Sequence, residues 1–180
     1  MQVDLYNEHT IERAMTFLFK SMESSTNSKP VALHSVRVAS ILWRNNASET
    51  AVVAALLHDL VEDTAVTIEE IERKFSSEVS VIVDACSFDS GDDNYLKKFE
   101  LAKLSINRSL DLGLNALLVK AADFIDNARY YHKVNDQELR TYLHGKYLYF
   151  IEQSNDVLKD NDIWQELIST YDTKVKPLKI

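Results

Sequence analysis

Apolar residues recur at helical spacing along most of the chain. The first stripe consists of Ile11, Met15, Leu18 and Met22. Pro30 suits the first turn of a second helix, and Ser48 can cap a third one, AVVAALLHDL at positions 51–60. This third segment is apolar nearly all round, so we expect it to be central in the fold.

The same spacing continues to the C-terminus. Thr67 and Glu70 form a capping-box pattern that opens a short fourth helix, and Gly113 is placed to end the sixth. Further helices are predicted over 78–85, 94–110 and 115–131, with one long and one short helix within 136–172. Because only 3 Gly and 2 Pro are available for turns, helices are favoured over strands. The sequence predicts one all-α domain, a helical bundle spanning residues 1–180.

Net charge, the length of apolar runs and the cysteine count limit the kinds of partner and compartment that the protein can have. The net charge of −8 and the pI of about 5.1 argue against a binder of duplex nucleic acid, but they allow a small phosphorylated ligand. No apolar run is long enough for a membrane span, and the N-terminus lacks the charge pattern of a signal peptide. The single cysteine, Cys86, cannot form an internal disulfide, which fits a reducing compartment. We therefore predict a cytoplasmic protein.

The segment LLHDLVEDT, residues 56–64, carries candidate chemistry. His58 and Glu62 are four residues apart, as are Asp59 and Asp63, so each pair shares a face if the helix continues. Three carboxylates near the C-terminal end of an apolar helix oppose its dipole, at a cost of roughly 0.3–1 kcal/mol each. A divalent cation would neutralise them, and imidazole with carboxylate is a ligand set suited to Mn, Fe, Zn or Ni.

Two other polar residues interrupt apolar helices. His34 lies in VALHSVRVAS, and Asp123 lies in LLVKAADFIDNARYY, with Asn127 four residues later. Taken singly, each of these is more often an ordinary core or surface residue than a ligand. Their coincidence, in the order His, His-Asp, Asp, is what indicates a shared site.

This order of residues resembles the HD superfamily of metal-dependent phosphohydrolases. More narrowly, the segment from His58 to Thr64, with its spacing His-Asp-x-x-Glu-Asp-Thr, is similar to the hydrolase domain of the RelA/SpoT family and its small stand-alone members. Three further stretches are also similar: HSVRVASIL from His34, VTIEEI from Val66, and VKAAD from Val119 with Asn127 and Arg129. The resemblance covers most of residues 8–132, and the predicted C-terminal helices at about 136–172 follow it.

The resemblance implies hydrolysis of the 3′-pyrophosphate of guanosine tetra- and pentaphosphate alarmones, with one divalent ion, usually Mn²⁺. Carried over by position, the metal ligands are His34, His58, Asp59 and Asp123. Glu62 and Asp63 then position and deprotonate the attacking water, and Asn127 contacts the substrate. Candidates for binding the phosphates are Lys98, Lys103, Lys120 and Arg129.

The sequence departs from the family just before His34. Where relatives carry a basic pair and a tyrosine, this chain has Glu23-Ser24 and Val31. In the relatives those residues help to hold the nucleotide through charge and stacking, so we expect weaker recognition of the base here. No synthetase or regulatory module follows within the 180 residues, so a hydrolase-only chain is expected.

Two alternatives to alarmone hydrolysis stay open. An HD phosphohydrolase acting on another nucleotide is favoured by the missing basic pair. A non-catalytic, metal-binding helical module is disfavoured by Glu62 and Asp63, since a structural ion needs no water-activating acids. The pattern leaves the oligomeric state open.

Overall fold

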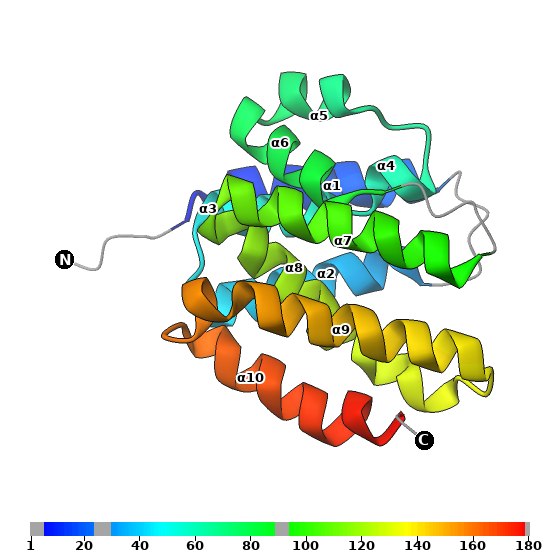
Figure 1. Cartoon of the computed structure of the whole chain (residues 1–180). Coiled ribbons are helices and arrows are strands. Elements are labelled where there is room, and N and C mark those ends of the chain that lie inside the picture. Colours follow the sequence, from blue (N-terminus) through cyan, green and yellow to red (C-terminus); the bar gives the residue numbers. More distant parts are fainter. Residues whose placement is uncertain (1–5, 24–29, 89–93, 179–180) are drawn as a thin grey trace.

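The structure is a computed structural model that describes residues 6–23, 30–88 and 94–178. Within these ranges every regular element is a helix, and the helices enclose one hydrophobic core (Figure 1). The prediction of an all-α fold is confirmed. No described helix is both long and apolar enough to cross a membrane.

The helices follow one another with short connections. In the first half they are α1 (Glu8–Met22), α2 (Val31–Arg44), α3 (Glu49–Leu57), α4 (Leu60–Asp63), α5 (Ile68–Lys74) and α6 (Ser77–Cys86). In the second half they are α7 (Tyr95–Leu112), α8 (Leu114–Asn127), α9 (Gln137–Leu158) and α10 (Asp162–Thr170). A 3₁₀ segment, Ala128–Lys133, follows α8. A π turn, Tyr171–Val175, and a short 3₁₀ turn, Lys176–Leu178, follow α10.

Three of the predicted helix boundaries are set by local chemistry. The Ser48 hydroxyl accepts a hydrogen bond from the backbone N–H of Ala51 (3.2 Å), and the Thr67 hydroxyl accepts one from that of Glu70 (3.3 Å). Each cap satisfies a backbone donor that the first helical turn leaves free. Gly113 has a φ of +93°, a conformation that favours glycine, and it separates α7 from α8. These starts and this stop are confirmed.

Two other predicted boundaries were wrong. The third helix was expected to run to Leu60, but α3 ends at Leu57, and a turn at His58 and Asp59 leads into α4. The Ser87 hydroxyl donates to the His58 carbonyl (3.2 Å), so that carbonyl has a partner outside any helical ladder. The seventh predicted helix was expected to reach Tyr131, but its last residues form the 3₁₀ segment.

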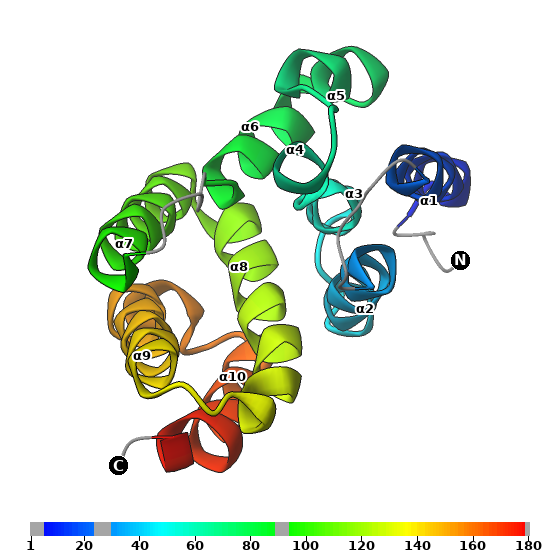
Figure 2. The same ribbon diagram turned by 90° about the vertical axis from the view of Figure 1, so that its right-hand side faces the viewer.

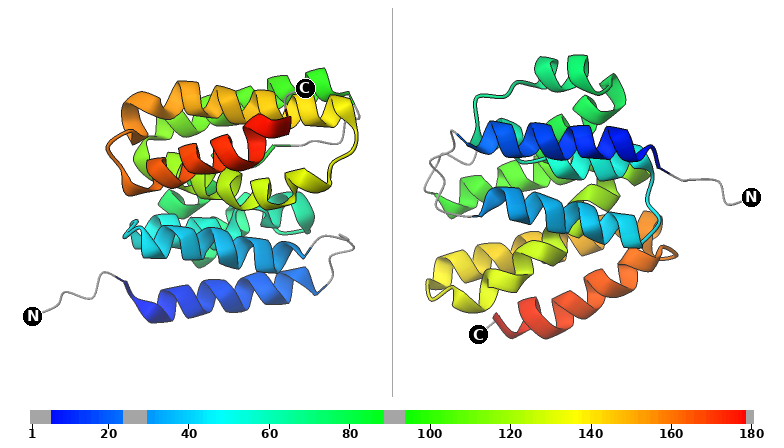
Figure 3. Two further views of the ribbon diagram at one scale, coloured as in Figure 1. Left: turned by 90° about the horizontal axis from the view of Figure 1, so that it is seen from below. Right: turned by 180° about the vertical axis from the view of Figure 1, so that it is seen from behind.

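Helix α8 lies at the centre of the molecule. It contacts α2, α3 and α6 on one side and α7, α9 and α10 on the other (Figure 2). Seen from below in Figure 3, α1 lies at one end of the stack and α9 with α10 at the other. Helix α3 is buried from Ala51 to Leu57, as its all-round apolar pattern predicted. The two most buried helices therefore border the region that holds the candidate site.

Candidate metal centre

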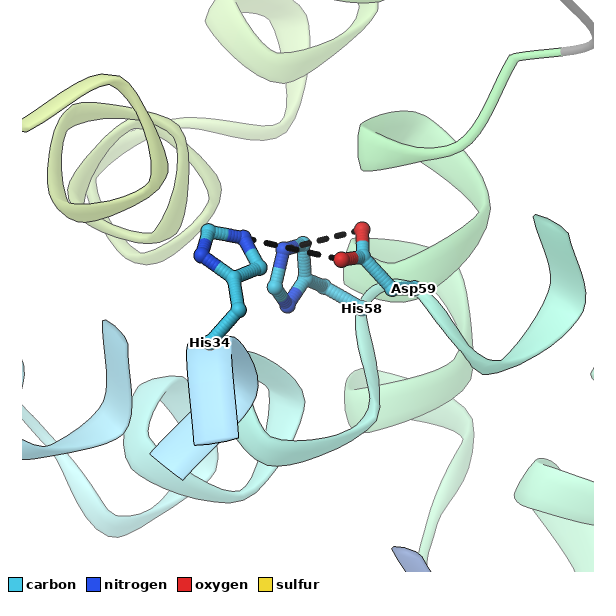
Figure 4. Close-up of side chains that lie close together, drawn as sticks. All are labelled: His34, His58 and Asp59. Atoms are coloured by element: carbon cyan, nitrogen blue, oxygen red, sulfur yellow. Dashed lines mark ion pairs between the residues drawn. The ribbon is translucent and has the colours of Figure 1, made fainter. Parts of the chain in front are cut away.

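Three parts of the fold bring polar side chains to one point. His34 comes from α2, His58 and Asp59 come from the turn between α3 and α4, and Asp123 comes from α8. One ligand atom from each of His34, His58 and Asp59 lies within 4.8 Å of the others (Figure 4). Residues that are far apart in the sequence therefore converge.

The donor atoms are mutually close. Oδ1 of Asp59 lies 3.0 Å from Nε2 of His58, and Oδ2 of Asp59 lies 3.5 Å from Nε2 of His34. Oδ1 of Asp123 lies 3.1 Å from Nε2 of His34 and 3.7 Å from Nε2 of His58. Two imidazole nitrogens and two carboxylates thus face a common point, and they are the four residues that the sequence singled out.

Two of the four residues are adjacent in the chain and lie where α3 ends. Successive residues of a continuous helix point about 100° apart, so adjacent side chains do not address the same point. The chain leaves α3 at His58, and Asp59 takes a φ of −94° and a ψ of −5° before α4 begins. Figure 4 shows the Asp59 carboxylate with an ion pair to the ring of His34 and another to the ring of His58. The break between α3 and α4, which was not predicted from the sequence, therefore lies at the site.

His58 is held in the tautomer that a metal ligand needs. Its Nδ1 atom lies 2.8 Å from the backbone carbonyl of Ala55, which can only accept, so Nδ1 carries a hydrogen. In the neutral ring the lone pair is then on Nε2, which is buried, faces Oδ1 of Asp59 at 3.0 Å and has no hydrogen-bond donor to accept from among the described residues. A buried acceptor without a partner is costly, and a bound cation removes that cost. The donor set therefore fits a divalent ion.

His34 is oriented in the same way by a carboxylate. Its Nδ1 atom lies 2.7 Å from Oδ2 of Asp126, a residue that is 1% exposed. Asp126 also accepts hydrogen bonds from Nε and Nη2 of Arg37, both at 2.8 Å, which keep it ionised. A carboxylate on the outer nitrogen fixes the ring and raises its basicity as a ligand. Asp126 was not among the residues predicted from the sequence. Its position one turn after Asp123 in an apolar helix was the feature that could have indicated it.

The electrostatics of the cluster favour a cation. Burial lowers the pKa of His34, but hydrogen bonds to Asp123 and Asp126 outweigh it and raise that pKa to about 9. Burial opposes charge on Asp123 too, yet a hydrogen bond from His34 and the positive charge of His58 hold its pKa well below the ordinary value. The carboxylates thus stay ionised at neutral pH and draw positive charge, which protons or a divalent ion can supply.

Glu62 and Asp63 lie on α4, directly after the ligand turn. Oε1 of Glu62 accepts a hydrogen bond from the backbone N–H of Phe88 (2.9 Å). Although part of the side chain is exposed, the protein around its carboxyl group and the charge of Asp59 raise the pKa of Glu62 to about 7, against the opposing effect of Lys120. A carboxylate with this pKa is suited to accept a proton at neutral pH.

Two predicted substrate residues lie beside the cluster. Nδ2 of Asn127 donates to Oδ1 of Asp123 at 2.5 Å, one turn further along α8. Lys120 is only 5% exposed, and its Nζ donates to the carbonyl of Cys86 at 2.6 Å. The pKa of Glu62 responds to Lys120, so this cation is close enough to act on charges at the centre.

The other three predicted cations are placed differently. Nζ of Lys98 lies 5.6 Å from the ring centre of Tyr95, and Lys103 pairs with Glu100 at 2.8 Å, both on α7. Arg129 lies 3.8 Å from Asp126 and lines a pocket between α2, α8 and α10. Within the described residues, no hydrogen bond or ion pair joins these three cations to the four predicted ligands.

Tyr142 on α9 is a second residue that the sequence analysis missed. Burial raises its pKa to about 12, with Glu62 and Asp123 adding to the shift and Lys120 opposing it, so its hydroxyl lies within electrostatic reach of all three. Its ring stacks on Tyr95, with centres 5.8 Å apart and planes at 28°. Because α9 lies beyond the motif region, no local pattern pointed to this residue.

Comparison with known proteins places this arrangement in a family. A model of the HD domain family matches residues 14–149, a range that includes every residue of the cluster. The chain belongs to the HD domain family. HD phosphohydrolases bind divalent metals, and the His-His-Asp group described above is of the kind that can hold one.

Individual relatives share part of the chain. A guanosine-3′,5′-bis(diphosphate) 3′-pyrophosphohydrolase of Xenopus tropicalis is 41% identical over 102 residues, which cover 56% of this chain and 55% of that protein. The human protein of the same name is 37% identical over 102 residues, with the same shares. A Haemophilus influenzae protein with that enzyme name is 33% identical over 110 residues, or 16% of its length. The chain therefore spans about half the length of the two animal relatives.

Solved structures share the fold. A metazoan orthologue of SpoT, described as hydrolysing ppGpp, superposes with a TM-score of 0.72 at 21% identity, covering 93% of this chain and 96% of that one. A Listeria monocytogenes protein gives a TM-score of 0.64 at 23% identity, covering 85% and 99%. These likenesses extend beyond the motif region into the C-terminal helices.

Proposed function

We propose that this chain is a metal-dependent phosphohydrolase that removes the 3′-pyrophosphate of guanosine alarmones. The observation that carries the proposal is the convergence of two imidazoles and two carboxylates on one point, with the carboxyl group of Glu62 directly after the ligand turn. The names of the Xenopus, human and Haemophilus relatives support the choice of substrate.

The proposed roles follow from the geometry of the cluster. His34, His58, Asp59 and Asp123 hold one divalent cation, with the imidazoles bound through Nε2. When bound, such an ion polarises phosphoryl oxygens and makes water more acidic. Glu62 accepts the proton of the attacking water, and Asp63 helps to orient that water. The bond between phosphorus and the 3′ oxygen breaks, pyrophosphate leaves, and the 3′ oxygen takes up a proton.

Several side chains are assigned to the substrate. Asn127, fixed to Asp123, presents its amide next to the phosphorus under attack, and Lys120 contributes positive charge at the same place. Lys98 and Lys103 are assigned to the outer phosphates from α7. Tyr142, stacked on Tyr95 and within electrostatic reach of Glu62, offers an aromatic surface for the nucleotide.

The remaining parts of the proposal concern the ion, the compartment and the domain. We propose Mn²⁺, which the resemblance to the RelA/SpoT hydrolases implies and which suits a mixed nitrogen and oxygen ligand set. The buried, free thiol of Cys86 supports a reducing environment such as the cytoplasm. We propose that residues 1–180 form one domain, because helices from both ends of the described chain contribute to one core.

A second candidate function is hydrolysis of another nucleotide by the same site. Glu23, an exposed acid after α1, occupies the place of a basic residue in the family pattern, while Ser24 lies outside the described residues. Val31, at the place of the family's tyrosine, is only 6% exposed. It therefore packs in the core and offers no aromatic ring to a nucleotide. Base recognition must then rest on other groups, such as Tyr142.

A nucleotide panel with Mn²⁺-loaded protein tests the proposal. Guanosine tetraphosphate, its adenosine counterpart, GTP, dGTP and a nucleoside 3′-monophosphate are incubated in parallel, and released pyrophosphate and phosphate are measured. We expect pyrophosphate release from the 3′-diphosphates alone, and none with Asp59→Asn. Turnover of GTP or dGTP in preference would support the second candidate, whereas Mn²⁺ binding without turnover of any nucleotide would overturn both.

A further inference from the structure

A separate pocket lies on the side of the molecule formed by α2, the end of α8 and α10. Figure 3, right, views these helices from behind. The pocket has a volume of about 190 Å³. Its charged lining comprises Arg37, Arg44, Arg129, Lys174, Asp126 and Glu166. Four cations and two carboxylates leave an excess of two positive charges, on a chain whose net charge is −8.

The two carboxylates of the lining do not neutralise all four of its cations. Asp126 already accepts two hydrogen bonds from Arg37 and lies 2.7 Å from His34, so its oxygens are occupied. Arg129 is 3.8 Å from Asp126, beyond hydrogen-bond distance, and its side chain is 58% exposed. Glu166 pairs with Arg44. The guanidinium of Arg129 therefore keeps donors for another group.

Lys174 is a second lining cation without a close carboxylate among the residues that the structure describes. It lies in the π turn after α10, and within the described residues no ion pair joins it to a carboxylate. Apolar side chains of Ile41 and Ile125 complete the lining, together with the hydroxyl-bearing residues Ser40 and Thr170. Arg129 and Lys174, together with the hydroxyl groups and apolar walls, form a setting that can bind an anion through charge-assisted hydrogen bonds.

We propose that this pocket binds a small tetrahedral oxyanion, namely inorganic phosphate or the phosphate group of a small ester. Guanidinium groups match the oxygens of phosphate with paired N–H donors, and Lys174 adds a point charge. The size of the pocket suits an oxyanion better than a whole nucleotide, since sites for larger ligands usually span about 300–1,000 Å³. The pocket is distinct from the metal centre, although Asp126 borders both.

Phosphate titration followed by isothermal calorimetry tests the proposal. Lys174→Ala and Arg129→Ala should each weaken phosphate binding about tenfold, because each removes a charge-assisted contact. Lys20→Ala on α1 and Arg73→Ala on α5 remove exposed cations outside the pocket and should leave the affinity unchanged. Both pocket positions are exposed, so these variants should fold, and circular dichroism checks that they do.

A metal-site variant distinguishes the pocket from the centre. Asp59→Asn should retain phosphate binding if the anion occupies the pocket, whatever the enzyme's substrate proves to be. Sulfate, a second tetrahedral oxyanion, should compete with phosphate in the wild type. The proposal is overturned if phosphate binding is lost in Asp59→Asn, or if it survives unchanged in both Lys174→Ala and Arg129→Ala.

Discussion

Nδ1 of His34 lies 2.7 Å from Oδ2 of Asp126, across 92 positions of sequence. Arg37, one turn after His34, donates two hydrogen bonds to the same carboxylate. The pair therefore connects α2 to α8 and fixes the ring whose other nitrogen faces the centre. Asp126 is thus expected to act on the metal through His34, without binding it.

Asp126→Ala should weaken the binding of Mn²⁺ about 10- to 100-fold, the usual loss when a partner of a ligating histidine is removed. The affinity is measured by titrating metal-free protein and detecting free Mn²⁺ by electron paramagnetic resonance. Asp111→Ala, which removes an exposed carboxylate from α7, is the control for the change in net charge. Equal affinities of folded Asp126→Ala and wild type would show that the contact does not support the ligand.

Metal binding should stabilise the fold. A cation present at about 100 times its dissociation constant adds about 2.7 kcal/mol to the free energy of unfolding, if the unfolded chain does not bind it. For a chain of this size that corresponds to a rise in Tm of about 5–10 °C, measured by differential scanning calorimetry. Asp59→Asn should lose most of the rise, while Asp156→Asn, an exposed change on α9, should keep it. A rise of the same size in both would place the ion elsewhere.

Glu62→Gln and Asp63→Asn should separate turnover from metal binding. Removing a general base typically lowers the rate about 10²–10⁴-fold, whereas the four ligands remain in place. Pyrophosphate release and Mn²⁺ affinity are measured on the same preparations. Glu69→Gln, an exposed acid on α5, serves as the control. Wild-type rates in both variants would remove these residues from the mechanism.

The rate should rise with pH through the titration of Glu62. Because the pKa of this carboxyl group is raised to about 7, it is protonated and inactive as a base below that pH and active above it. A cation in the centre stabilises the carboxylate, so the midpoint in the loaded enzyme should lie at or below 7. The pH profile of kcat/KM shows this, and the corresponding step should be missing in Glu62→Gln. An identical step in that variant would assign it to another group.

The departure before His34 predicts weak recognition of the base. A lost cation–π or stacking contact costs about 0.5–2 kcal/mol, or about 2- to 30-fold in affinity. Native protein should therefore show a high KM for guanosine tetraphosphate and little preference for guanine over adenine. The double change Glu23→Arg and Ser24→Lys should lower KM and leave kcat nearly unchanged. Tight, guanine-selective turnover by the native chain would instead direct attention to Tyr142 and Lys98.

Local sequence was enough to predict the helical fold and much of the site. The caps at Ser48 and Thr67 depend on a side chain and a backbone N–H three residues later. The stop at Gly113 depends on the ability of glycine to adopt a positive φ. Each of these signals is local, so it can be predicted from the sequence. The four residues proposed as ligands stood out because each interrupts an otherwise apolar stretch of the sequence. Their convergence could be inferred from the pattern, but not their distances.

Tertiary structure decided the rest. The carbonyl of His58 is approached by the Ser87 hydroxyl, 29 positions away, and Asp126 gains its role only from its contact with His34. Tyr142 comes within electrostatic reach of Glu62 and Asp123 because α9 packs against α8, and Arg129 lines a pocket to which α10 also contributes. Hydrogen bonds and desolvation act between atoms that the folded chain brings together, and the spacing of residues along one helix carries no record of which other helix will lie opposite.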